Sequence, residues 1–127
     1  MHSYITFYTD EGEELYQMQT DNENDAQYIV ENTRPKNCSY IIVRCYLHLG
    51  EMINGLKYIR VHDFAKGKIF DLINCKDEFI VLGNYYPSVQ RDSEGNYSLY
   101  RGEERLSEEE ISNINEYGRT SKPSINK

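Results

Sequence analysis

The chain has 127 residues and a formal net charge of −7, and 39% of its residues are hydrophobic. This length suits one domain whose core needs no disulfides or metal, and we predict a single domain over residues 1–118 with a polar basic tail over residues 119–127. The apolar runs are far shorter than the roughly 20 residues of a membrane span, and residues 1–12 lack the features of a secretory signal. Three cysteines without a C-x-x-C spacing indicate buried thiols. Together these features predict a cytoplasmic protein.

Charge is segregated along the chain. Residues 1–33 hold eight acids and no Lys or Arg, residues 34–91 carry a net +4, residues 92–116 a net −6, and residues 117–127 three bases. Two interpretations stay open. Either the acidic elements are neutralised by basic neighbours or form a solvated face, or the acids form one surface that engages a basic partner. The choice depends on whether the two acidic blocks meet in space.

The first residues predict a β-hairpin. Residues 3–9 place Tyr and Thr side chains alternately with Ile5 and Phe7, and residues 15–19 alternate in the same way. A period of two is typical of a strand with two distinct faces. Residues 10–14 contain a glycine and four acids, so the hairpin gathers its carboxylates at the tip.

Two short helices are predicted. The first runs over about residues 22–33, because polar capping residues precede it and Pro35 ends it. The second runs over about residues 107–117, where Ser107 and Glu110 have the spacing of a capping box. Three glutamates in its first turn suit the positive end of the helix dipole.

The middle of the chain is β-rich. Residues 39–64 read as a long hairpin around Asn54-Gly55, with Ile53 opposite Leu56, so that each pair of residue numbers sums to 109. One face is then mostly apolar and the other mixed. The mostly apolar face holds Val43, Cys45, Leu47, Leu49, Ile53, Leu56, Tyr58, His62 and Phe64.

The remaining segments complete the fold class. Residues 66–76 fit either a strand or a short helix, whereas residues 79–86 and 97–101 continue a meander of hairpins around a turn at residues 92–96. We therefore predict an α+β fold, with an antiparallel sheet of five to seven strands and two short helices.

Metal and catalytic motifs are weak. Residues 21–32 lack the glycine at position 6 and the glutamate at position 12 of a calcium loop. Cys45 and His48 point to opposite faces of a strand, which disfavours zinc. No nucleophile elbow, phosphate-binding loop or H-E-x-x-H motif is present. We predict no metal and no cofactor, and we favour a non-catalytic protein while leaving open acid–base chemistry by His62 with Asp63 or Asp71.

The aromatic residues favour an interface. The chain has twelve tyrosines and no Trp, and tyrosine is enriched in the cores of protein interfaces. The preference of tyrosine for strands explains its abundance equally well. Basic residues interleaved with tyrosines in the middle of the chain are of the types that bind nucleic acid, but the flanking acids repel a polyanion. Direct nucleic-acid binding is therefore not expected.

The favoured function is that of a small acidic inhibitor that binds a protein with a basic groove, such as a nuclease or another nucleic-acid-binding protein. Carboxylates on alternate residues of a strand lie about 6.6 Å apart, comparable to the spacing of phosphates along a nucleic-acid strand. In being small and acidic with no recognised motif, the chain resembles the nucleic-acid mimics of phages and mobile elements, which implies an anti-defence role. The predicted partner-binding residues are Asp10, Glu11, Glu13, Glu14, Asp21, Glu23, Tyr85, Tyr86, Tyr97, Tyr100, Glu103 and Glu104.

Two other functions stay open. One is a small-ligand-binding domain or small enzyme with a pocket on the sheet lined by Tyr58, His62 and Tyr85. The other is a homo-oligomeric structural subunit that associates through strand edges or tyrosines, of which a homodimer is the simplest form.

Overall fold

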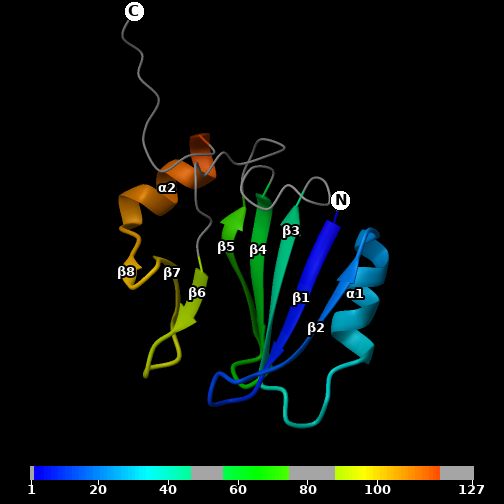
Figure 1. Cartoon of the computed structure of the whole chain (residues 1–127). Coiled ribbons are helices and arrows are strands. Elements are labelled where there is room, and N and C mark those ends of the chain that lie inside the picture. Colours follow the sequence, from blue (N-terminus) through cyan, green and yellow to red (C-terminus); the bar gives the residue numbers. More distant parts are fainter. Residues whose placement is uncertain (1, 47–55, 75–87, 118–127) are drawn as a thin grey trace, which may run out of the picture.

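Alternating side chains build two antiparallel sheets in the computed structural model, which describes residues 2–46, 56–74 and 88–117 (Figure 1). The strands of the larger sheet are β1 (His2–Tyr8), β2 (Glu14–Thr20), β3 (Tyr40–Tyr46), β4 (Leu56–Asp63) and β5 (Lys68–Asn74). The smaller sheet contains β6 (Ser88–Arg91), β7 (Tyr97–Arg101) and β8 (Glu104–Arg105). The strand orders are β2-β1-β3-β4-β5 and β6-β7-β8. The helices are α1 (Glu23–Asn32) and α2 (Glu108–Tyr117).

These elements confirm the predicted α+β class, the antiparallel strands and the two helices. The strands are divided between two sheets, and the ambiguous segment of residues 66–76 contributes β5. The predicted strand at residues 79–86 and the Asn54-Gly55 turn lie outside the described residues. So does the predicted tail, and the division of the chain at residue 118 stays a prediction.

Covering elements pack on each face of the larger sheet. On one face, Ala26 and Val30 of α1 pack on Ile5, Phe7 and neighbouring side chains of β1 and β3. The opposite face packs against the smaller sheet and α2. Its buried cluster contains Tyr40, Ile42, Tyr46, Leu56, Ile59, Val61 and Ile73 from the sheet, and Leu99, Leu106 and Ile114 from the covering elements. The larger sheet is therefore the middle layer of the molecule.

Local capping fixes where both helices begin. The Asn22 side chain accepts hydrogen bonds from the backbone N–H groups at the start of α1. At α2, the Ser107 hydroxyl accepts from the Glu110 backbone at 3.1 Å, while the Glu110 carboxylate accepts from the Ser107 backbone at 3.0 Å. This reciprocal pair confirms the predicted capping box. No helix in the described part of the chain is long and apolar enough to cross a membrane.

The predicted register of the β3–β4 hairpin is wrong. Val43 lies opposite Arg60, so the pairs sum to 103 rather than 109, and a register shift between Cys45 and Tyr46 moves Leu56 to the face of Tyr46. An even shift keeps most side chains on their predicted faces. The face expected to be mixed, however, places Ile59 and Val61 in the core with no exposure. Packing against the smaller sheet explains this, because that contact is not visible in the local pattern.

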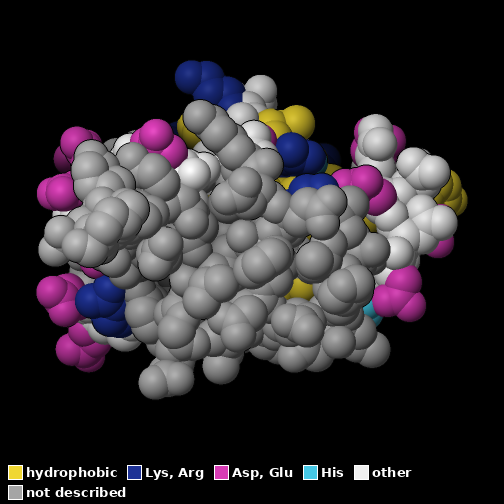
Figure 2. All heavy atoms as spheres, turned by 90° about the horizontal axis from the view of Figure 1, so that it is seen from above, with side chains coloured by type: hydrophobic (Ala, Val, Ile, Leu, Met, Phe, Trp, Pro, Cys, Tyr) yellow, Lys and Arg dark blue, Asp and Glu magenta, His cyan; other side chains and the backbone are white. Residues whose placement is uncertain are grey.

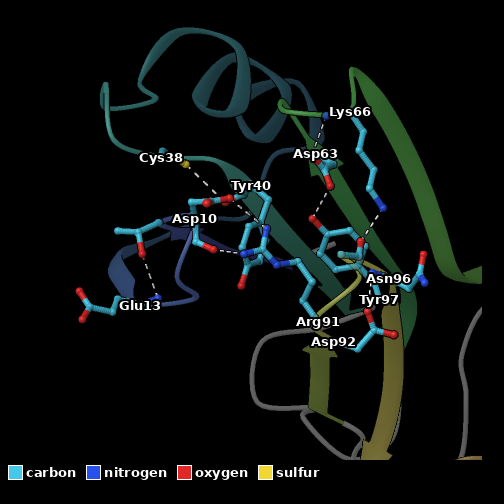
Figure 3. A network of polar contacts seen from close by, with 12 residues as sticks. Asp10, Glu13, Cys38, Tyr40, Asp63, Lys66, Arg91, Asp92, Asn96 and Tyr97 are labelled. Atoms are coloured by element: carbon cyan, nitrogen blue, oxygen red, sulfur yellow. Dashed lines mark hydrogen bonds and ion pairs between the residues drawn. The ribbon is translucent and has the colours of Figure 1, made fainter.

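A buried carboxylate joins the two sheets (Figure 3). Asp63, at the end of β4, is only 3% exposed. It accepts a hydrogen bond from the Tyr97 hydroxyl of β7 at 2.5 Å and another from the Lys66 backbone N–H at 3.0 Å. The ring of Tyr97 packs against Tyr40 and Phe70 of the larger sheet. A buried charge must be satisfied by such donors, so Tyr97 ties the smaller sheet to the larger one.

Replacing Tyr97 with Phe should lower the free energy of unfolding by about 2 kcal/mol, because the buried Asp63 carboxylate loses a donor while the ring packing stays. Urea denaturation measures this difference. Tyr100→Phe is the matched control on the same strand, since no described residue hydrogen-bonds its hydroxyl, and it should change stability by less than about 0.5 kcal/mol. Equal effects of the two substitutions would contradict a structural role for the Tyr97–Asp63 bond.

Candidate functional site

The turn between β1 and β2 presents exposed acids on a fixed backbone. Gly12 adopts φ +87° there, a conformation that favours glycine. The Thr9 and Glu13 backbones bond at 2.9 Å, and the Thr9 hydroxyl accepts from the Glu13 N–H at 3.1 Å. Asp10, Glu11, Glu13 and Glu14 are exposed at or beside this turn. The hairpin therefore confirms the predicted gathering of carboxylates at the tip.

Arg91 connects this tip to the hairpin between β6 and β7 (Figure 3). Its guanidinium donates to the backbone oxygen of Asp10, lies 3.7 Å from the Asp10 carboxylate, and sits 4.5 Å from the centre of the Tyr40 ring. A groove of about 410 Å³ between the two hairpins is lined by Glu11 and Asp92, among others. Asp92, the first acid of the second acidic block, therefore lies beside the acids of the first block here.

The acids at this junction come from both hairpins. Asp92 and Glu94 are exposed, and the Asp92 carboxylate accepts from the backbones of Glu94 and Asn96 at 2.9 Å each, which holds the turn. These backbone hydrogen bonds lower the pKa of Asp92 below its ordinary range, so it stays charged. We define the acidic hairpin end as Asp10, Glu11, Glu13, Glu14, Asp92 and Glu94.

The other predicted acids lie elsewhere. Asp21 follows β2 at the end of the strand away from the hairpin tip and bonds to His2. Glu23 begins α1, and Glu103 and Glu104 are exposed at the connection of β7 and β8. Figure 2 shows acidic side chains gathered on the side of α1 and on the side of α2, with basic and hydrophobic side chains between them. The described acids among the predicted residues therefore lie on more than one side of the molecule.

Two of the four predicted tyrosines, Tyr97 and Tyr100, lie among the described residues. Tyr97 is half-buried and engaged with Asp63. Tyr100 is half-buried on the same strand. Tyr85 and Tyr86 lie outside the described residues. Cys38 and Cys45 are buried, as predicted, and Cys75 lies outside the described residues.

A second concave surface lies between α1 and the uncovered part of the larger sheet. α1 packs on β1 and β2 and leaves the same face of β4 and β5 without a covering element among the described residues. The resulting groove has a volume of about 760 Å³, in the range of small-molecule sites. Its wall on α1 includes Glu23, Gln27, Val30 and Glu31, followed by Arg34, and its floor includes Tyr58, Arg60, His62, Phe64, Ile69 and Asp71. We call it the helix-side groove.

Cation and aromatic side chains are paired in the helix-side groove. The Arg60 guanidinium donates to both carboxylate oxygens of Asp71, at 2.6 and 3.2 Å, and lies 4.8 Å from the centre of the Tyr58 ring. The Arg34 guanidinium lies 3.8 Å from the centre of the Phe64 ring. Burial raises the pKa of the Tyr58 hydroxyl, so it stays protonated.

His62 is half-buried in the middle of the floor. Burial lowers the pKa of its imidazole below the ordinary value of 6.5, and the charge of Arg60 lowers it further, against the opposing effects of Asp71 and Glu31. A neutral imidazole offers one hydrogen-bond donor and one acceptor. Tyr58 and His62 are two of the three side chains predicted for a ligand pocket on the sheet.

Sequence reasoning missed several groove residues. Ile69 lies directly opposite His62, and Asp71 opposite Arg60. With residues 68–72 taken as a strand, the alternation of their side chains indicates that Ile69 and Asp71 share one face. The sequence places Arg34 among the basic residues of the middle of the chain, but its position beside Phe64 depends on how α1 packs.

No family model, curated protein or solved structure matches the chain. Among residues 2–46, 56–74 and 88–117, no group of three or more His, Cys, Asp or Glu side chains is arranged to hold a metal ion.

Stability should depend on pH through His62. Because the folded protein disfavours the imidazolium, the unfolded chain takes up the proton more readily below pH 6.5, so this contribution to stability falls as the pH drops from 7.5 to about 5. His62→Gln removes that difference in proton binding. Urea denaturation at both pH values should show a smaller loss of stability for the variant than for the unsubstituted protein. Parallel losses would show that His62 does not carry the effect.

Proposed function

We propose that this chain is a non-catalytic protein-binding protein that engages a basic surface of its partner through the acidic hairpin end. The observation that carries the proposal is the contact of Arg91 with Asp10, which brings carboxylates from two distant parts of the sequence to one edge of the molecule. Aligned charges of one sign steer a partner of opposite sign and fix its orientation.

The neighbouring cations do not cancel this charge. Arg91 is engaged by Asp10 and stacked on Tyr40. The Lys66 ammonium donates a hydrogen bond to the backbone oxygen of Gly95 at 2.5 Å. The loop after α1 reaches the same end of the sheet in Figure 1 and carries the exposed Lys36. Arg105 of β8 also acts electrostatically on the Asp92 carboxylate. These four cations stand against six carboxylates, so the net charge of these groups is negative.

The finer form of the proposal is that the partner is a nucleic-acid-binding protein, which the chain inhibits by occupying its basic groove. The negative charge of the acidic hairpin end supports this finer form, whereas the spacing of its carboxylates does not. Only Glu14, among the four acids of the first hairpin, lies in a strand, so the expected regular spacing of carboxylates along a strand is not present. A mimic of this kind would compete with nucleic acid for the same groove, and this competition separates the finer form from binding to any other basic protein.

Reversing Glu11, Glu13 and Glu14 to Lys should weaken partner binding by about 100-fold, since each reversal replaces an attraction with a repulsion at the interface. The partner is first captured from cells of the native host and identified by mass spectrometry. Its dissociation constant for the purified chain is then measured by calorimetry at two salt concentrations. The affinity should fall steeply as salt rises.

The matched control reverses three exposed acids outside the acidic hairpin end, Glu103, Glu104 and Glu116, to Lys. This variant has the same net charge as the test variant and should retain at least about half of the affinity, because its charges lie away from the contact. Loss of binding in the control alone would move the interface to β8 and α2. Affinity that is unchanged by the test reversals, or insensitive to salt, would overturn the proposal. Added duplex DNA should displace the chain if the finer form is correct.

A further inference from the structure

The helix-side groove has a floor with a repeating pattern of side chains. Tyr58, Arg60, His62 and Phe64 occupy alternate positions along β4 and its end, so they point to the same face. Ile69 stands directly opposite His62 on β5 and is 64% exposed. This is one of the largest exposed apolar side chains in the described part of the chain, and it lies in a concave site rather than on a convex surface.

The two arginines of the groove differ in availability. Arg60 is engaged by both oxygens of Asp71 and is neutralised by that pair. Arg34 stacks on Phe64, and no described residue forms an ion pair or hydrogen bond with its guanidinium. A guanidinium stacked on a ring keeps its N–H groups free at the edge, in a geometry that suits a carboxylate or phosphate. Of the two arginines that the structure describes in the groove, Arg34 is therefore the one available to a ligand.

His62 adds a polar group that is not used by the described part of the fold. Neither of its ring nitrogens has a hydrogen-bond partner among the described residues, and the ring is half-buried between Arg60 and Ile69. In contrast, the Glu31 carboxylate on the helix wall accepts a hydrogen bond from Gln27 at 3.1 Å. The imidazole supplies one donor and one acceptor beside an apolar surface.

The acids of the wall limit the charge of the occupant. Glu23 and Glu31 line the groove on α1, and the long row of phosphates in a nucleic acid would meet their repulsion. A single anionic group beside Arg34 avoids most of that repulsion. The apolar side chains of the floor, Ile69 and Phe64, favour an occupant with a hydrophobic body, because displacing water from them is favourable.

We propose that the helix-side groove binds a small planar organic anion, an aromatic ring that carries one carboxylate or phosphate group. The anion pairs with Arg34, the ring covers Ile69, and a polar substituent of the ring bonds to His62. This site is separate from the acidic hairpin end, and the proposal does not depend on the function proposed for that end.

The test uses NMR titration of the isotope-labelled full chain with three probes. 6-Hydroxy-2-naphthoate and adenosine monophosphate carry the shared chemistry as carboxylate and phosphate, each with a polar group on the ring, and 6-(hydroxymethyl)-2-naphthol is the neutral analogue of the first. At least one anion should bind saturably and shift the amide signals of Arg34, His62 and Ile69, and the probe that does so identifies the acid group. The neutral analogue should bind about tenfold more weakly, which is the effect of losing one hydrogen bond to a charged group.

Matched substitutions locate the contacts. Arg34→Gln should weaken binding of the anion about tenfold, whereas Lys36→Gln, which removes an exposed charge two positions away that does not line the groove, should leave it within about twofold. Ile69→Asn should also weaken binding about tenfold through lost apolar contact. Tyr28→Asn is its control, because Tyr28 is 63% exposed on α1 and does not line the groove.

Three results would overturn this inference. One is the absence of saturable binding by either anion at concentrations up to about 5 mM. Another is equal affinity for the anions and the neutral analogue. The third is equal weakening by Arg34→Gln and Lys36→Gln. The spectra also show directly whether each variant is folded. If Arg34→Gln is unfolded, the comparison of Ile69→Asn with Tyr28→Asn tests the site instead.

Discussion

The fold depends on burying both faces of β3 at once. Six of its seven residues are buried, and because neighbouring side chains of a strand point to opposite faces, the strand needs a covering layer on each side. α1 supplies one layer, and the smaller sheet with α2 supplies the other. The position of each binding surface follows from this requirement, since α1 reaches only part of the sheet and leaves the helix-side groove, while the smaller sheet brings the β6–β7 hairpin to the β1–β2 turn.

Local signals in the sequence predict much of this fold. The caps at Asn22 and Ser107 and the alternation in β1 depend on residues that are close in the chain, and each is present in the structure. The register of β3 and β4 was predicted from a turn alone. The observed register places Val43 opposite Arg60 and includes a shift between Cys45 and Tyr46, and no local pattern in the sequence indicates that shift.

The same distinction explains the candidate sites. Composition identified the acids of the first hairpin, but it did not show that Asp92 would join them, because that meeting depends on Arg91 reaching Asp10 across the fold. The tyrosines illustrate the limit more clearly. Tyr97 is of a residue type that is enriched at interfaces, yet its hydroxyl donates a hydrogen bond to the buried Asp63 carboxylate within the fold. Conversely, the prediction of a pocket at Tyr58 and His62 named two residues that do line a groove, without Arg34 and Ile69, which complete it.

The stack of Arg91 on Tyr40 has a consequence for the energetics of recognition. Tyr40 also stacks on Tyr8 with ring centres 4.9 Å apart, and Tyr8 ends the strand that leads into the acidic turn. These stacked side chains connect the acidic turn to the core, so the backbone of the turn is ordered before a partner binds. Most of the conformational entropy of the Asp10 to Glu14 segment is lost when the chain folds rather than when a complex forms, so a partner that matches these carboxylates gains their attraction without the cost of ordering a loop.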